Sequence, residues 1–200
     1  MAKNSKPKDI RGTRTEKNLV VAYMAESSAY SRYTFYAGQA EKENYFPIQR
    51  VFQETAANEL RHAKIYFKYL QGGSVPVELP VDAGVIGTTA ENLETAAKEE
   101  RYEGVELYKK AADVAEEEGF DEIASHFRAI AEIEEHHRRR FLHYLKQVKE
   151  GTVWKRDKPI VWKCLVCGYE YKGTEPPAEC PACDHPREHY MAMDYVESLE

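Results

Sequence analysis

The chain has 200 residues, 31 % of them charged, and a formal net charge of −6. A net negative charge argues against a general binder of nucleic acid or of anionic membranes, because both attract basic surfaces. No apolar run approaches the roughly 20 residues that a membrane-spanning helix needs. The basic start of the chain lacks the apolar core typical of a secretory signal. The length allows one helical bundle and a small additional module.

The start of the chain predicts a polar arm followed by a helix. We expect residues 1–12 to form a loose arm. Thr13 and Glu16 have the spacing of a capping box, which predicts a helix beginning near Thr15. Apolar residues recur along this helix at steps of three or four, and Glu26 lies on the same stripe.

A second helix is expected to begin at Pro47, because proline suits the first helical turn. Its apolar stripe includes Glu59 and His62, and the Gly72-Gly73 pair is typical of a helix end.

Residues 72–88 contain two prolines and four glycines and show no helical period. Such a segment is long for a connection within a bundle. It predicts a crossover along the length of the bundle, as in ferritin-like folds.

The third helix is expected between a second capping box, Thr88 with Glu91, and Gly119. Glu100 lies on its apolar stripe, and Glu103 follows one turn later.

The fourth helix is expected to be capped by Asp121 and to stop at Gly151, with Glu134 and His137 on its apolar stripe. The halves 15–71 and 90–150 therefore resemble two copies of one helical hairpin.

Acidic residues and histidines recur on the buried stripes of these four helices. Glu26 precedes Glu59 by 33 residues and Glu100 precedes Glu134 by 34, and each second glutamate begins a Glu-x-x-His motif. Residues three apart share one helix face, and an unpaired buried charge would be very costly. Two cations would offset the repulsion, as in di-iron or di-manganese four-helix bundles. The predicted ligands are Glu26, Glu59, His62, Glu100, Glu103, Glu134 and His137.

Simpler interpretations exist for some of these residues. A single Glu-x-x-His motif is usually an exposed polar pair, and Glu103 could be an exposed helix glutamate. His136 points about 100° away from His137 by helical geometry and is therefore excluded. Several tyrosines are expected to pack in the core, with one or two donating a hydrogen bond to a ligand carboxylate. They are Tyr23, Tyr30, Tyr33, Tyr36 and Tyr108.

Composition changes after Gly151, where residues 153–163 are β-branched, aromatic and basic and suggest extended chain or short strands. All four cysteines follow, in two C-x-x-C pairs: Cys164, Cys167, Cys180 and Cys183. This clustering indicates a metal site rather than disulfides. Four thiolates suit zinc or a single iron, and the Cys-Gly-Tyr and Cys-Pro turns with nearby aromatic residues favour iron.

With both motif sets in view, the chain resembles the rubrerythrin family over nearly its whole length. The matching segments are MAES, NELRHAK, KEERYE and EEHHRRRF, followed by CLVCG and CPAC. The resemblance implies a ferritin-like di-iron four-helix bundle over residues 1–152 and a rubredoxin-like Fe(Cys)₄ domain over residues 153–200. Asp184 departs from the pattern, because free-standing rubredoxins usually have a glycine there. Such a position tends to need a positive φ, which aspartate tolerates.

The resemblance also implies a function and partners. It implies a cytoplasmic peroxidase that reduces hydrogen peroxide to water, with electrons passed from the single iron to the di-iron site. An electron-donor protein, a rubredoxin or its reductase, would supply them, and the protein would form a domain-swapped or head-to-tail homodimer. Glu103 and His62 would alternate as ligands of one iron. Two alternatives remain open at this stage: a ferritin-like protein that oxidises or stores iron, and a non-catalytic binding module with a zinc-containing tail.

Overall fold

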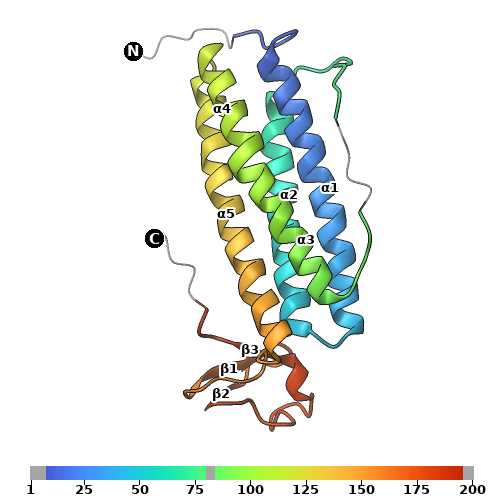
Figure 1. The fold of residues 1–200 in the computed structure, drawn as a ribbon, viewed down its shortest axis with the longest axis vertical. Coiled ribbons are helices and arrows are strands. Elements are labelled where there is room, and N and C mark those ends of the chain that lie inside the picture. The colour runs from blue at the N-terminus through green and yellow to red at the C-terminus, as the bar shows by residue number, and fades with distance from the viewer. Residues whose placement is uncertain (1–7, 80–83, 196–200) are drawn as a thin grey trace.

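The computed structural model describes residues 8–79 and 84–195. It consists of a long helical bundle with a small β-containing domain at one end (Figure 1), which confirms the predicted fold class. The helical segments are α1 (Arg14–Lys42), α2 (Phe46–Tyr69), α3 (Thr89–Arg101), the π-helix η1 (Tyr102–Leu107), α4 (Tyr108–Glu117) and α5 (Asp121–Glu150). No helix in the described part of the chain is long and apolar enough to cross a bilayer.

The helix ends mostly follow the local sequence signals. The Thr13 side chain accepts a hydrogen bond from the Glu16 amide at the start of α1, and Thr88 with Glu91 forms a complete capping box at the start of α3. Gly151 ends α5 in the left-handed conformation, with a φ of 67°. The predicted cap of α5 is wrong. Phe120 occupies the N-cap position without a side-chain hydrogen bond, so Asp121 is the first helical residue.

The expectation of one uninterrupted third helix is also wrong. The segment divides into α3, the π-helix η1 and α4, which continue one another along the bundle. Within η1, a Cβ atom added to Gly104 would lie 2.9 Å from the carbonyl oxygen of Ala131 and 3.1 Å from the Cβ of Glu134. Glycine therefore permits a close approach of η1 to α5 beside one of the predicted ligands.

The arm that precedes α1 is not loose where it is described. Ile10 is only 2 % exposed and packs in the apolar cluster at this end of the bundle. The Lys8 ammonium lies over the Phe120 ring and donates to the backbone carbonyl of Glu118. The rest of the predicted arm, residues 1–7, lies outside the described residues.

Each half of the bundle caps the first helix of the other half. Glu118, at the end of α4, accepts from the Thr15 amide and hydroxyl and from the Arg14 amide. Burial alone would raise the pKa of Glu118, but these hydrogen bonds lower it to about 2. Glu43, at the end of α1, accepts from the Thr89 amide at the start of α3. These contacts tie together the two hairpins that the sequence repeat predicts.

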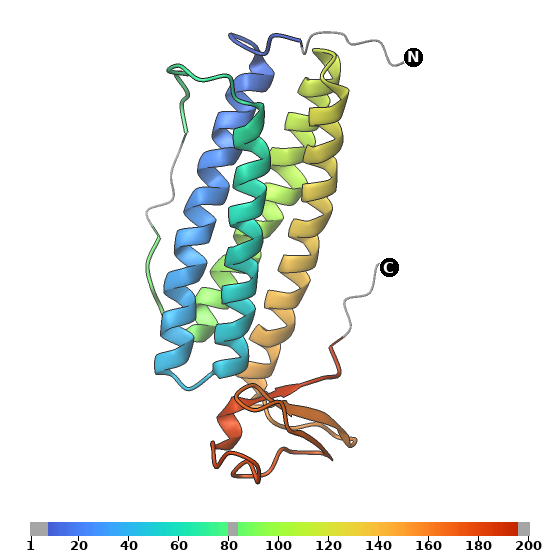
Figure 2. The same cartoon turned by 180° about the vertical axis from the view of Figure 1, so that it is seen from behind.

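The described parts of the connection between α2 and α3, residues 70–79 and 84–88, run along the outer side of α1 in both views (Figures 1 and 2). The Tyr36 hydroxyl donates to the Val85 carbonyl, which fixes this connection against α1. The segment is therefore the crossover that its composition predicts.

The C-terminal domain is a three-stranded antiparallel sheet in the order β2-β1-β3. The strands are β1 (Ile160–Cys164), β2 (Glu170–Gly173) and β3 (Tyr190–Ala192), and a short 3₁₀ helix η2 (Arg187–His189) precedes β3. Its core holds the fully buried Trp162 and Tyr190 beside two of the cysteines.

This domain packs against the end of the bundle where α1 joins α2 (Figure 2). The rings of Phe46 and His189 stack with centroids 3.7 Å apart, and those of Tyr45 and Trp154 stack at 5.6 Å. Residues 151–159 link α5 to β1. Together with this link, the ring contacts hold the domain against the end of the bundle.

Candidate metal centres

Six of the seven predicted bundle ligands lie together in the interior. Glu26 comes from α1, the Glu59-x-x-His62 pair from α2, Glu100 from α3 and the Glu134-x-x-His137 pair from α5. Their ligand atoms form two groups, each with all atoms within 4.8 Å of one another. The first group is Glu26, Glu59, His62 and Glu134; the second is Glu59, Glu100, Glu134 and His137. Glu59 and Glu134 belong to both groups, as carboxylates that bridge two metals would.

Each histidine turns its Nδ1 atom toward the carboxylates. The Nδ1 of His62 lies 2.9 Å from Glu59 and 3.1 Å from Glu134. The Nδ1 of His137 lies 2.9 Å from Glu134 and 3.1 Å from Glu59. The two rings lie with centroids 6.0 Å apart. The i, i+3 spacing thus points two candidate ligands per helix in one direction.

Two buried tyrosines hold the remaining carboxylates. The Tyr33 hydroxyl donates to Glu100 at 2.7 Å, and the Tyr108 hydroxyl donates to Glu26 at 2.6 Å. Burial, followed by nearby carboxylate charges, raises the pKa of both tyrosines well above 10, so both keep their hydroxyl hydrogens at neutral pH. The expectation that one or two tyrosines donate to ligand carboxylates is confirmed.

The pKa shifts in the site show how much negative charge its side chains bring together. Burial, and then the charge of Glu134, raises the pKa of Glu26 and of Glu100 well above the usual value. Burial would lower the pKa of His62, but the close contacts of its ring with the carboxylates of Glu134, Glu26 and Glu59 outweigh burial and raise the pKa to about 12. The buried carboxylates therefore require positive charge beside them, which a protonated imidazole or a metal cation can supply.

The donor set fits a pair of cations. One oxygen on each of four buried glutamates has no partner with hydrogen-bond geometry in the described part of the chain and only an ion-pair contact with a histidine: Glu26 Oε2, Glu59 Oε1, Glu100 Oε2 and Glu134 Oε1. These four oxygens face histidine Nδ1 atoms at distances between 3.1 and 3.7 Å. Carboxylate oxygens and imidazole together suit iron and manganese. Two metal ions would therefore supply these four oxygens with the ligand bonds for which the histidine contacts have poor hydrogen-bond geometry.

Glu103 is the one predicted bundle ligand outside both groups. It lies on η1, is partly exposed, and follows the buried Glu100 by three residues. Burial, and then the charges of Glu26 and Glu134, raises its pKa well above the usual value. The charges of the two ligand groups therefore affect the pKa of Glu103, although Glu103 belongs to neither group. Its role as a ligand stays a prediction.

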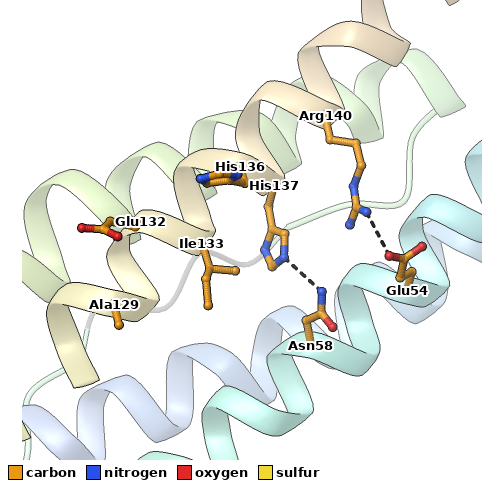
Figure 3. Close-up of a pocket in the computed structure, with 8 residues that line it drawn as sticks. All are labelled: Glu54, Asn58, Ala129, Glu132, Ile133, His136, His137 and Arg140. Carbon is orange, nitrogen blue, oxygen red and sulfur yellow. Dashed lines mark hydrogen bonds and ion pairs between the residues drawn. The ribbon is translucent and has the colours of Figure 1, made fainter. Parts of the chain in front are cut away.

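A cavity of about 280 Å³ opens between α2 and α5 on the outer side of His137 (Figure 3). In the wall of this cavity, the Nε2 atom of His137 lies 3.3 Å from the side-chain nitrogen of Asn58. Arg140, which is buried, donates to Glu54 and to Thr55 on α2. Our sequence interpretation included neither Asn58 nor Arg140, although an arginine three residues after His137 on a buried stripe was a usable signal. His136 also lines the cavity, outside both ligand groups, as its helical angle predicts.

The four cysteines form a separate centre in the C-terminal domain. Their sulfur atoms lie within 4.8 Å of one another, with 3.7 Å between Cys164 and Cys183 and between Cys167 and Cys180. Sulfurs bound to one tetrahedral ion at about 2.3 Å would lie about 3.8 Å apart, so the spacing fits a single metal.

Two related turns shape this centre. Gly168 and Asp184, each directly after the second cysteine of a pair, have φ values of 80° and 59°. Their amides donate to the carbonyls of Cys164 and Cys180 at 2.9 Å in both cases. The predicted positive φ of Asp184 is thereby confirmed.

Comparison with known proteins agrees with both halves of the chain. Residues 17–145 match the family model described as rubrerythrin, and residues 162–191 match the rubrerythrin rubredoxin-like domain. A rubrerythrin from Porphyromonas gingivalis is 47 % identical over 186 residues, covering 93 % of each protein. Another, from Nitratidesulfovibrio vulgaris, is 43 % identical and covers 93 % of this chain and 97 % of that protein.

Solved structures of nigerythrin are also similar. Its mixed-valent state superposes with a TM-score of 0.62 and 28 % identity, covering 96 % of this chain and 91 % of that chain. Its fully reduced, all-ferrous state gives a TM-score of 0.61 at 29 % identity. The chain therefore belongs to the rubrerythrin family, a family of iron-containing oxidoreductases.

Proposed function

We propose that this protein is a non-haem di-iron peroxidase that reduces hydrogen peroxide to water and protects against oxidative stress. The observation that carries the proposal is the presence of two different ligand clusters in one chain, a buried carboxylate–histidine pair of groups and a four-cysteine centre. Reduction of one peroxide to two waters consumes two electrons and two protons. A centre for two metals and a separate one-electron carrier divide that task between them.

We propose iron for all three metal positions, two in the bundle and one between the cysteines. A similar solved protein, nigerythrin, is described in an all-ferrous state. Two iron ions in the bundle would supply the pair of electrons that breaks the oxygen–oxygen bond.

The side chains of the bundle would hold and orient this pair. Glu59 and Glu134 would bridge the two positions, because both ligand groups share them. Tyr33 and Tyr108 keep Glu100 and Glu26 in place through their hydroxyl hydrogens. The family resemblance implies that either Glu103 or His62 would hold the metal at the position nearer Glu26.

The division of labour can be tested by removing the carrier alone. Cys164→Ser should abolish steady-state peroxide reduction with a reduced rubredoxin as the electron donor. A chemically pre-reduced bundle of the same variant should still consume about one equivalent of peroxide, because one turnover needs only the two electrons it already holds. The complementary variant Glu59→Ala should lose both activities together with its bundle metal. Loss of the single turnover in Cys164→Ser, with the bundle fully loaded, would refute the proposed roles.

We further propose that electrons pass between two protomers of a head-to-tail homodimer. His137 lies 14 residues before Gly151, which corresponds to about 21 Å of helix, and the cysteine domain packs beyond that end of the bundle. Such a distance is long for rapid electron tunnelling. A two-fold partner could place its own cysteine domain beside this bundle, and no exchange of helices is needed because both ligand groups form within one chain.

Mixed dimers test this path. One protomer would carry Cys164→Ser, and the other would carry Glu26→Ala together with Glu59→Ala. Neither homodimer should turn over, whereas the mixed dimer pairs one intact cysteine domain with one intact bundle in different chains. About half of the wild-type activity per dimer is the expected result. An inactive mixed dimer with its metals loaded would place the path within one chain.

A further inference from the structure

The two ring nitrogens of His137 have different surroundings. Nδ1 faces inward, 2.9 Å from a Glu134 oxygen and 3.1 Å from a Glu59 oxygen. Nε2 faces outward into the cavity between α2 and α5, 3.3 Å from the side-chain amide of Asn58 (Figure 3). Nδ1 is therefore the nitrogen directed at the proposed metal positions.

A histidine that binds a metal through one nitrogen carries its hydrogen on the other. For His137 that hydrogen is on Nε2, which must donate it to an acceptor if the ring is to be held. An asparagine side chain offers both an NH₂ group and a carbonyl oxygen, and a half-turn of the amide exchanges them. Asn58 can thus present Oδ1 where its amide now faces Nε2.

We propose that Asn58 is the positioning residue of His137. Its Oδ1 accepts the Nε2 hydrogen and so fixes both the ring orientation and the tautomer that leaves Nδ1 free to bind metal. This inference rests on the proposed function, because it assigns a role to a residue that would support one of the ligand groups.

The buried arginine of the cavity cannot take this role. The guanidinium of Arg140 is a donor only, and it is bonded to Glu54 and Thr55. Among the residues that line the cavity, Asn58 is the one hydrogen-bonded to His137.

Of the two candidate ligand histidines, His137 alone is hydrogen-bonded to an asparagine among the described residues. His137 follows His62 by 75 residues, and the residue that follows Asn58 by the same interval is the apolar Ile133. Within residues 8–79 and 84–195, no hydrogen bond reaches the Nε2 atom of His62. The sequence repeat thus preserves the ligands but not this acceptor, as expected for a contact specific to one metal position.

Zinc(II) provides a test that needs no enzymatic activity. Metal-free full-length protein would first be given zinc to fill the cysteine centre, and the two bundle positions would then be titrated against a chelator of known affinity. Asn58→Leu, which keeps the size but removes the acceptor, should weaken one of the two bundle positions by about 10–100-fold. It should also remove the slowly exchanging Nε2 hydrogen of His137 from the nuclear magnetic resonance spectrum.

Two further variants separate the acceptor from side-chain shape. Asn58→Asp keeps an acceptor oxygen and should retain most of the affinity and the Nε2 hydrogen. Glu132 lines the same cavity without a hydrogen bond to His137. The variant Glu132→Leu should therefore match the wild type in both measurements. The inference is overturned if Asn58→Leu binds zinc like the wild type, or if Asn58→Asp is as weak as Asn58→Leu. Failure of the wild-type bundle to take up two metals would instead overturn the proposed function itself.

Discussion

Two glycines in the helices of the bundle should respond oppositely to the same substitution. A Cβ atom added to Gly38 in α1 would have no neighbour within 4 Å. Gly38→Ala therefore only restricts the unfolded chain and improves helix propensity, which should raise the free energy of unfolding by about 0.5–1 kcal/mol. The site lies elsewhere in the bundle, so metal binding should not change.

Gly104→Ala should instead destabilise the protein. The added Cβ would lie 2.9 Å from the Ala131 carbonyl oxygen and 3.1 Å from the Glu134 Cβ. Neither atom can rotate away, so η1 or α5 must shift. Overpacking of this kind costs about 1–3 kcal/mol, and the helix-propensity gain of about 1 kcal/mol offsets part of it. We expect a net loss of up to about 2 kcal/mol in the free energy of unfolding, together with weaker metal binding because Glu134 moves.

Urea unfolding of the metal-free proteins, followed by circular dichroism, measures the first quantity, and metal titration measures the second. Gly38→Ala is the matched control for both. If Gly104→Ala were as stable as Gly38→Ala and bound metal equally well, the close approach of η1 to α5 would have no energetic role, contrary to the prediction.

Three further predictions concern single carboxylates and one tyrosine. Glu103→Ala should keep two metal ions per bundle but slow peroxide turnover, whereas Glu59→Ala should lose bundle metal, as metal analysis and stopped-flow kinetics can establish. Tyr108→Phe should weaken metal binding about tenfold, because it frees one ligand carboxylate. Glu118→Gln should lower the free energy of unfolding by about 1–2 kcal/mol at neutral pH, while the exposed Glu117→Gln changes it by about 0–0.5 kcal/mol. Because the folded-state pKa of Glu118 is about 2 and its usual value 4.5, its contribution is complete above pH 4.5 and disappears as the pH falls toward 2.

The parts of the fold that the sequence predicts well are those set by local chemistry. The Thr88 capping box, the left-handed Gly151 and the positive φ of Asp184 each depend on a few neighbouring residues. Where tertiary packing decides, the predictions fail. Ile10 is buried because it meets a cluster built from distant helices, and the chain before α5 places Phe120 rather than a polar side chain at the N-cap.

The site divides in the same way. Helical spacing predicts that Glu59 and His62 point in one direction, and the structure shows that they do. The partner of each supporting residue lies far away in the chain. Tyr108 meets a carboxylate 82 residues earlier, and Asn58 meets a ring 79 residues later. No local pattern specifies such pairs, so they require the packed helices.

One long-range feature was nevertheless present in the spacing of the motifs. Glu100 follows Glu26 by 74 residues, whereas Tyr108 follows Tyr33 by 75. The second half therefore contains one additional residue between its glutamate and its tyrosine, which is also why its two ligand motifs are 34 rather than 33 residues apart. A π-helical turn is wider than an α-helical turn and accommodates one extra residue, and the π-helix Tyr102–Leu107 lies in this interval. It restores the register, so that Tyr108 reaches Glu26 across the bundle just as Tyr33 reaches Glu100. A difference of one residue between two otherwise equivalent helices thus predicts where the backbone departs from the α-helix, and that departure lies beside the proposed metal site.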